Sequence, residues 1–220
     1  MAAYAGIDNF ESYSVGDLNG GNGGSGFSDA WGTTTLVDVQ STVTRNASST
    51  RAVTVTAANV PSEPYIARTL TTGADSGDFY GSMRKSLTSG VQDYFFYGGA
   101  TLAFYVRFDS AGNINLVGTT TVAIVTSPSA NQWYDINVNW VSATSVKARY
   151  KLNTDTSWGS FTTAVTLSGG ISSITIVKIG CQNNGTAPDM YWDDIQNTDP
   201  TPVTATSGKN FPTLTLLGVG

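Results

Sequence analysis

The sequence predicts an all-β protein that folds as a two-sheet antiparallel jelly-roll β-sandwich. Apolar and polar residues alternate with a period of two in several short segments, which is the pattern of half-buried strands. Clusters of Gly, Asn and Ser separate these segments, and such clusters are typical of turns. No long window combines an apolar period of 3.6 with capping residues, so little helix is expected. The spacing of the segments fits about 11–14 strands in two sheets.

Individual segments support this assignment. The clearest alternation lies in Thr101–Asp109, Trp133–Val141 and Ser145–Leu152, and Val53 and Val55 alternate with threonines in a shorter one. Ile174–Ile179 is a nearly continuous apolar run, as expected for a central strand covered on both sides. Cys181 follows this run and is the only cysteine. We expect an inert buried thiol there, with a reactive or intermolecular thiol as the alternative.

The chain divides at residue 197. Residues 1–197 are expected to form the sandwich, and residues 198–220 a linker followed by an apolar C-terminal arm. The linker is polar and contains Pro200 and Pro202, which favour an extended chain. The arm either packs on its own domain or adds to the sheet edge of a neighbouring subunit. Its candidate partner-binding residues are Phe211, Leu214, Leu216 and Leu217.

Composition restricts the partners. Only 12% of the residues are charged, the net charge is −5, and the eleven Lys and Arg are scattered along the chain. Nucleic acid is therefore an unfavourable partner. No apolar run approaches the roughly 20 residues that span a bilayer, so no membrane insertion is expected. The first residues contain neither a basic nor an apolar stretch of the kind that opens a secretion signal, and we expect none.

Catalysis is disfavoured by residues that are missing. The chain has no histidine, which removes the commonest general base, the commonest zinc ligand and every Ser-His-Asp arrangement. Glu11 and Glu63 are the only glutamates. They are far apart in the sequence, so they do not form the close pair of carboxylates that glycoside hydrolysis uses.

Two motifs resemble those of known families. Ile7-Asp8-Asn9-Phe10-Glu11-Ser12-Tyr13 and a later Trp31 stand near the start, and Met190-Tyr191-Trp192-Asp193-Asp194-Ile195 stands near the end. Together they resemble the opening and closing strands of concanavalin A-like jelly rolls, which include laminin-G-like domains, lectins and glucanases. They are also similar to those of galactose-binding-like carbohydrate-binding modules. The resemblance implies that the first and last strands lie side by side. The E-x-D-x-x-E motif of the family's hydrolases is missing.

The paired terminal strands would bring four carboxylates together. Asp8, Glu11, Asp193 and Asp194 are the candidate metal ligands, and an oxygen-only set favours a structural calcium ion. By resemblance to galactose-binding-like modules, Glu11 and one of the two adjacent aspartates would hold it. The alternative is that these carboxylates accept hydrogen bonds from loop backbone. Because Asp193 and Asp194 are adjacent on a strand, they are expected to point to opposite faces.

A candidate ligand surface lies on one hairpin. A three-residue loop around Thr144 would pair Asn139 with Lys147, Asn137 with Arg149 and Asp135 with Lys151. The outward strip would then offer polar groups to sugar hydroxyls, with Trp133 on the same side and Trp158 as an exposed aromatic candidate. The alternative is a solvated face with cross-strand ion pairs. The candidate ligand-binding residues are Trp133, Asp135, Asn137, Asn139, Arg149 and Trp158.

These observations predict a non-catalytic structural or adhesive protein on a virion surface, such as a capsid decoration or fibre-type subunit that also binds glycans. We expect a homo-oligomer that contacts other virion subunits through its arm. The first alternative is a carbohydrate-binding, lectin-like module of a secreted, extracellular bacterial protein. The second is a divergent glycoside hydrolase. Part of this prediction rests on analogy between folds.

Overall fold

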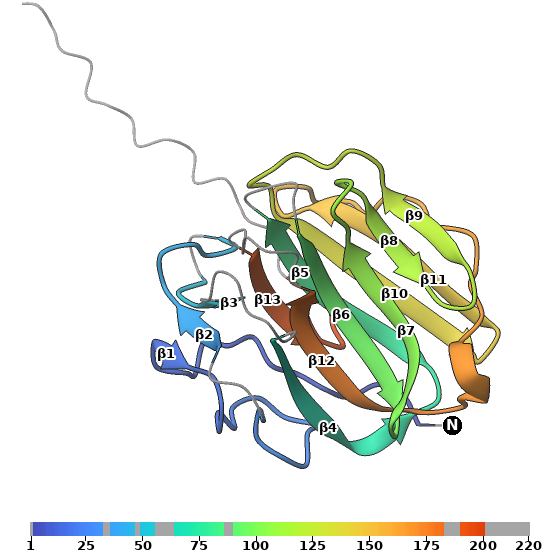
Figure 1. Cartoon of the computed structure of the whole chain (residues 1–220), viewed down its shortest axis with the longest axis horizontal. Helices are drawn as coiled ribbons and strands as arrows, with labels where there is room; N and C mark the ends of the chain where they lie inside the picture. Colours follow the sequence, from blue (N-terminus) through green and yellow to red (C-terminus); the bar gives the residue numbers. More distant parts are fainter. Residues whose placement is uncertain are drawn as a thin grey trace, which may run out of the picture.

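The computed structural model describes residues 2–32, 36–46, 49–55, 64–85, 90–182 and 190–200. Within them, two antiparallel sheets of seven and six strands pack face to face (Figure 1). The predicted all-β sandwich is therefore confirmed. The helical content of the described residues is one short 3₁₀ turn, η1 (Ser168–Gly170).

The strand order follows a jelly-roll pattern of long crossovers. The seven-stranded sheet contains, in spatial order, β1 (Gly16–Asp17), β2 (Val37–Gln40), β3 (Ala52–Val55), β13 (Met190–Gln196), β5 (Gly77–Lys85), β10 (Tyr134–Ser142) and β11 (Ser145–Leu152). The six-stranded sheet contains β4 (Tyr65–Ala74), β12 (Ile174–Gln182), β6 (Val91–Gly98), β7 (Thr101–Phe108), β8 (Ile114–Val117) and β9 (Thr121–Val125). The apolar run that begins at Ile174 thus belongs to an inner strand, as predicted.

The β10–β11 hairpin has the predicted register. Asn139 pairs with Lys147, Asn137 with Arg149 and Asp135 with Lys151. The connection differs, because a bulge between Trp140 and Ser142 leaves two residues between the strands instead of three. The bulge leaves the pairing of the remaining hairpin unchanged.

The core lies between the sheets and is rich in aromatic rings. Phe96 and Phe104 stack with their centroids 4.3 Å apart, and Phe79 contacts Phe96 edge-on at 4.8 Å. Such pairs add about 0.5–1.5 kcal/mol each beyond the area that they bury. The inward residues of the alternating segments fill this core. Trp31, Trp140 and Trp192 are at most 1% exposed, so they belong to the core, and the Cys181 side chain is buried as well.

The first and last segments of the sandwich are hydrogen-bonded to each other. The backbone N–H of Asp8 donates to the carbonyl of Ile195 at 2.7 Å, and the N–H of Ile195 donates back to Asp8 at 2.8 Å. The sequence expectation that the first and last segments lie side by side is confirmed. This pairing sets the Asp8–Tyr13 segment beside β13.

The chain after β13 stays on the sandwich up to its last described residue. The Asp199 carboxylate accepts a hydrogen bond from Lys151, and Pro200 is buried. The arm residues Phe211, Leu214, Leu216 and Leu217 lie outside the described residues. In the described part of the chain, no helix is long and apolar enough to cross a membrane.

Candidate functional site

The outer face of the seven-stranded sheet carries three rows of polar side chains across β5, β10 and β11. Residues paired across neighbouring strands share one face of a sheet. The first row is Ser82, Asp135 and Lys151, and Asp193 of β13 pairs with Ser82. The second row is Tyr80, Asn137 and Arg149, and the third is Asp78, Asn139 and Lys147. The strip predicted as a ligand surface spans all three rows.

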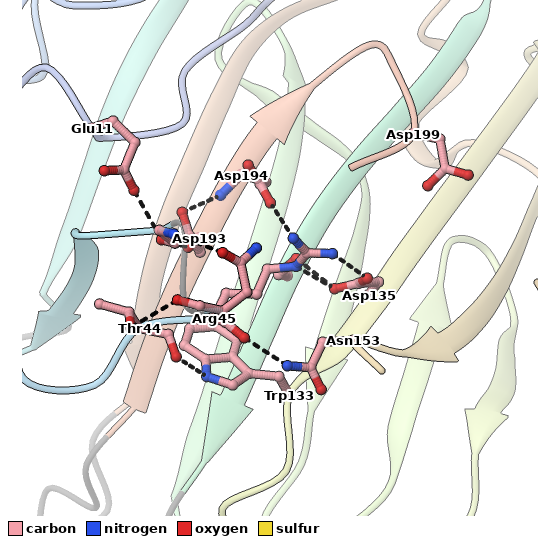
Figure 2. A network of polar contacts seen from close by, with 12 residues as sticks. Glu11, Thr44, Arg45, Trp133, Asp135, Asn153, Asp193, Asp194 and Asp199 are labelled. Carbon is pink, nitrogen blue, oxygen red and sulfur yellow. Dashed lines mark hydrogen bonds and ion pairs between the residues drawn. The ribbon is translucent and has the colours of Figure 1, made fainter. Parts of the chain in front are cut away.

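Arg45 covers the first row. This residue follows β2, and its guanidinium inserts over the sheet so that the side chain is only 2% exposed. Its Nε and Nη2 donate to the two oxygens of Asp135 at 2.8 and 2.6 Å (Figure 2). Ser82 Oγ donates to the same carboxylate at 2.8 Å. This two-pronged geometry is the strongest form of a carboxylate pair. The carboxylate of Asp135 is therefore occupied by hydrogen bonds from other side chains of the protein.

Trp133 does not form a platform for a sugar ring. It is 5% exposed and packs in a small cluster with Ala52 and Tyr191. Its indole N–H donates to the carbonyl of Thr44 at 3.1 Å (Figure 2). The prediction of an exposed Trp133 is wrong, because the segment that carries Arg45 folds over it.

The alternative of cross-strand ion pairs on a solvated face is also wrong for the first row. Asp135 pairs with Arg45, whereas Lys151 donates to Asp199 at 2.9 Å, although Asp135 and Lys151 face each other in register. Asn137 is fully buried and accepts a hydrogen bond from Arg149 Nε at 2.8 Å. Asp135 and Asn137 are thus internal partners rather than ligand contacts.

A bulge changes the direction of the Asp193-Asp194 pair. The register shifts between Asp193 and Ile195, and Asp194 has a φ of 53°. Asp194 Oδ2 lies 3.4 Å from Arg45 Nη1, and Asp193 also interacts electrostatically with this guanidinium. The expectation that these neighbours point to opposite faces is therefore wrong. Strict alternation fails because the extra residue of a bulge resets the side-chain direction.

The four predicted metal ligands fall into two groups. The Asp8 carboxylate is buried and binds Arg68 at 3.0 Å, the Tyr13 hydroxyl at 2.6 Å and the Trp31 indole at 2.9 Å. Glu11 instead accepts hydrogen bonds from the backbone and hydroxyl of Thr50 at 2.9 and 2.6 Å. This matches the alternative in which the carboxylates hold loop backbone.

Ser49 connects Glu11 and Asp193, two carboxylates of the second group. Its Oγ lies 2.8 Å from Glu11 Oε1 and 2.8 Å from Asp193 Oδ2. Within the ranges that the structure describes, no three His, Cys, Asp or Glu side chains are arranged to hold a metal ion. Calcium binding by these residues stays a prediction, and the oxygens of Glu11 already have protein donors.

The bulge carboxylates titrate above their ordinary range. Burial raises the pKa of Asp194 to about 6, and the carboxylates of Asp135 and Glu11 add to the effect while Arg45 opposes it. Burial and the adjacent Asp194 raise the pKa of Asp193 well above its usual 3.8. One arginine thus lies among several carboxylates. Because the pKa values of Asp193 and Asp194 are raised, the folded protein keeps protons on them at pH values where the unfolded chain would release these protons.

We expect this proton binding to make stability fall as pH rises from about 4 to 6. In that window the folded state binds more protons than the unfolded state, so the free energy of unfolding decreases with pH. For Asp194 alone the loss is roughly 2–3 kcal/mol. Asp194→Asn keeps a residue that tolerates positive φ and removes this titration. Urea unfolding of both proteins across this range checks it: the variant should gain stability relative to the original as pH rises. Parallel pH profiles would contradict this account.

The rest of the outer face is open. Asp78, Tyr80, Asn139, Arg149 and Trp158 are partly exposed, and Phe161 is 40% exposed. We call these six residues the open patch. Of the predicted ligand residues, Asn139, Arg149 and Trp158 lie in it.

The open patch is held together by ring and cation contacts. The Arg149 guanidinium lies 4.4 Å from the centre of the Phe161 ring and 5.2 Å from the centre of Trp158. Tyr80 packs against Trp158 at 5.7 Å, and the Trp158 indole donates to Asp199 at 2.8 Å. Burial, and then the Asp78 carboxylate, raise the pKa of Tyr80. The patch therefore combines fixed aromatic rings with a protonated hydroxyl, a carboxylate and a guanidinium.

Sequence reasoning missed half of this patch. Asp78 and Tyr80 belong to β5, whose pairing with β10 joins segments about 60 residues apart in the chain. Phe161 lies in the segment after β11 that returns along this strand through the Thr162–Ala148 and Val165–Val146 backbone bonds. The sequence contains one signal for Asp78 and Tyr80: they alternate with the apolar Phe79, which predicts that both lie on the outer face of a strand.

Comparisons with known proteins identify the fold. No protein-family model and no curated protein matches the sequence. A sialidase matches 90% of the chain with a TM-score of 0.54 and 8% identity, and the chain spans only 18% of that enzyme. A carbohydrate esterase from the Shiga toxin-encoding bacteriophage phi24B matches with a TM-score of 0.52 and 16% identity, over 83% of this chain and 98% of the esterase.

An endo-β-1,4-glucuronan lyase from the fungus Trichoderma reesei matches with a TM-score of 0.52 and 13% identity, over 88% of this chain and 98% of the lyase. At these identities the likeness establishes the fold alone. The chain has a concanavalin A-like jelly-roll fold, which is typical of carbohydrate-binding and carbohydrate-active proteins. The resemblance drawn from the terminal motifs is confirmed at this level.

Proposed function

We propose that this chain is a non-catalytic carbohydrate-binding protein that uses the open patch to bind glycans on the outside of a virion. The observation that carries the proposal is the stack of Trp158, Arg149 and Phe161 at 5.2 and 4.4 Å on the outer face of the seven-stranded sheet. Aromatic faces pack against the C–H groups of a sugar ring, while fixed polar groups orient its hydroxyls.

Preorganisation favours binding at this patch. Arg149 is held by the Asn137 side chain at 2.8 Å, and the Asp78 carboxylate accepts bonds from Asn137 and Asn139 at 3.0 and 3.1 Å. Side chains that are already ordered lose little conformational entropy when a ligand arrives. A small, rigid patch of this kind supports weak binding of single sugars, which multiple copies on a particle would strengthen.

The arrangement of carboxylates supports a non-catalytic role. Glycoside hydrolysis uses two carboxyl groups that flank the scissile bond and reach it. On this face Asp135 is bound by Arg45, and Asp193 is buried against Ser49. Asp78 is the carboxylate within the open patch, and it holds two asparagines. Release of reducing ends or unsaturated products from any glycan would contradict this part of the proposal.

We expect Phe161→Ala and Trp158→Ala each to weaken glycan binding by about tenfold or more, which corresponds to ~1.4 kcal/mol. A glycan array identifies the ligand, and isothermal titration then compares the variants. Phe161 is the cleaner position, because Trp158 also binds Asp199. Val15→Ala is the matched control, since Val15 is 58% exposed and belongs to the segment before β1. Unchanged affinity in both patch variants would place the ligand elsewhere.

The virion assignment is supported by composition and by one structural neighbour. The chain is only 12% charged, and the phage esterase has the same fold over nearly its whole length. We further propose a homo-oligomer whose copies contact other virion subunits through the apolar C-terminal arm of the 198–220 segment. Mass spectrometry of purified particles tests the location. Recovery of the protein only as a free secreted monomer would favour the lectin-like module of a bacterial protein.

A further inference from the structure

The outer face of the six-stranded sheet carries an unusual concentration of aromatic rings and cations. Its residues come from four neighbouring strands, β4, β12, β6 and β7, which stand side by side in Figure 1. We call this group the back patch. Its members are Tyr65, Phe95, Tyr97, Tyr105, Arg107 and Lys178.

Phe95 forms the centre of the back patch. It is in register with Lys178 on one side and Tyr105 on the other. Its ring lies 4.9 Å from Tyr65 and 5.5 Å from Tyr105, measured between centroids. The tyrosines cover it so well that Phe95 is only 4% exposed, although it points away from the core between the sheets. Three half-buried tyrosines therefore form a fixed platform.

Gly180 makes room for this platform. A Cβ atom at this position would collide with the ring of Tyr65 and with the carbonyl of Pro64. Because Gly180 pairs with Tyr65, the Tyr65 ring leans over the glycine towards Phe95. A glycine inside a strand is typical of a place where another group approaches the backbone closely.

Two cations lie against the rings of the back patch. Lys178 Nζ lies 4.2 Å from the centre of the Tyr97 ring, and the Arg107 guanidinium lies 4.7 Å from the centre of Tyr105. Asp93 is fully buried and is bound by Arg107 at 2.7 and 3.0 Å. In the described part of the chain, no carboxylate lies within ion-pair distance of Lys178. Asp93 thus neutralises Arg107, and Lys178 supplies the net positive charge of the back patch.

We propose that the back patch is a second binding site, specific for an acidic saccharide such as a uronic-acid oligomer. The tyrosine faces would hold the sugar rings, and Lys178 would bind a carboxylate. Pairing of two copies through this face is disfavoured, because a two-fold contact would bring the same cations together. The site lies on the opposite sheet from the open patch, so the inference stands even if the open patch binds nothing.

Titration with oligogalacturonate tests the proposal, with a neutral malto-oligosaccharide of equal length as the comparison ligand. We expect the acidic oligomer to bind more tightly and to lose affinity as salt rises. Lys178→Gln and Tyr105→Leu should each weaken binding about fivefold or more, whereas Val15→Ala, which changes an exposed residue outside both patches, should leave it unchanged.

Three outcomes would overturn the proposal. The first is that the original protein does not bind oligogalacturonate at all. The second is binding that Trp158→Ala abolishes and the back-patch variants leave intact, which would assign the acidic sugar to the open patch. The third is equal or tighter binding of poly-glutamate, which would make the site one for acidic peptides. Circular dichroism of each variant confirms that it folds.

Discussion

Replacing Arg45 by methionine is expected to lower the free energy of unfolding at pH 7 by about 3–5 kcal/mol. Methionine matches the length of the arginine stem but leaves Asp135 without its cation. Asp135 is fully buried, and the Ser82 hydroxyl, at 2.8 Å, would remain as a donor to its carboxylate. Asp194 also loses its nearest cation, 3.4 Å away. Urea unfolding followed by tryptophan fluorescence measures the change.

Two comparisons isolate the buried charge. Arg84→Met is the control, because Arg84 is half-buried, binds Asn131 and packs on Tyr191 at 5.2 Å; we expect a loss below about 1 kcal/mol. Combining Arg45→Met with Asp135→Asn should recover part of the stability, since the unpaired charge is gone. If the single Arg45 variant were as stable as the Arg84 variant, Arg45 would not organise this face.

Asp8→Asn is expected to cost a similar amount, about 3–5 kcal/mol. The substitution keeps the shape of the side chain and removes the charge. Asp8 is 1% exposed, and Arg68, its partner at 3.0 Å, is 2% exposed. The same carboxylate accepts bonds from Tyr13 and Trp31, so the N-terminal segment depends on it.

Limited proteolysis of the N-terminal segment gives a second readout for Asp8→Asn. Local loosening should expose cleavage sites before residue 32 at lower protease concentration. Asp75→Asn serves as the matched control, because its carboxylate is half-buried and accepts one bond from Ala2 N at 3.2 Å. Equal stability of the two variants would show that the Asp8–Arg68 pair contributes little.

The sequence was sufficient to predict the strands and one hairpin register. Period-two alternation specifies which face of a strand is buried, and a shift by one residue would move every core residue to solvent. Ile136, Val138 and Val146 therefore fix the β10–β11 pairing, and the observed register agrees with it. The terminal motifs were equally informative, since Asp8 and Ile195 do pair.

The same period-two alternation could not predict that the segment carrying Arg45 covers part of the predicted ligand surface. Arg45 lies 90 residues from Asp135 in the chain, and no local periodicity indicates that a loop returns over a distant sheet. The bulge at Asp194 could not be predicted from alternation either. The alternating pattern assumes that each residue of a strand faces one residue of its neighbour, and a bulge breaks this rule. The wrong expectations for Trp133 and Asp135 come from the distant loop that carries Arg45, and the one for Asp194 comes from the local bulge.

The central claim is that glycans bind at the open patch, and indole resonances test it most directly. The chain has five tryptophans, so a ¹⁵N-labelled sample gives one indole N–H signal for each, and Trp158→Phe assigns the signal of Trp158. Titration with the best glycan from the array should shift the Trp158 signal while those of Trp31, Trp133, Trp140 and Trp192 stay in place. A shift of the Trp133 signal alone, or no shift at saturating ligand, would contradict the claim.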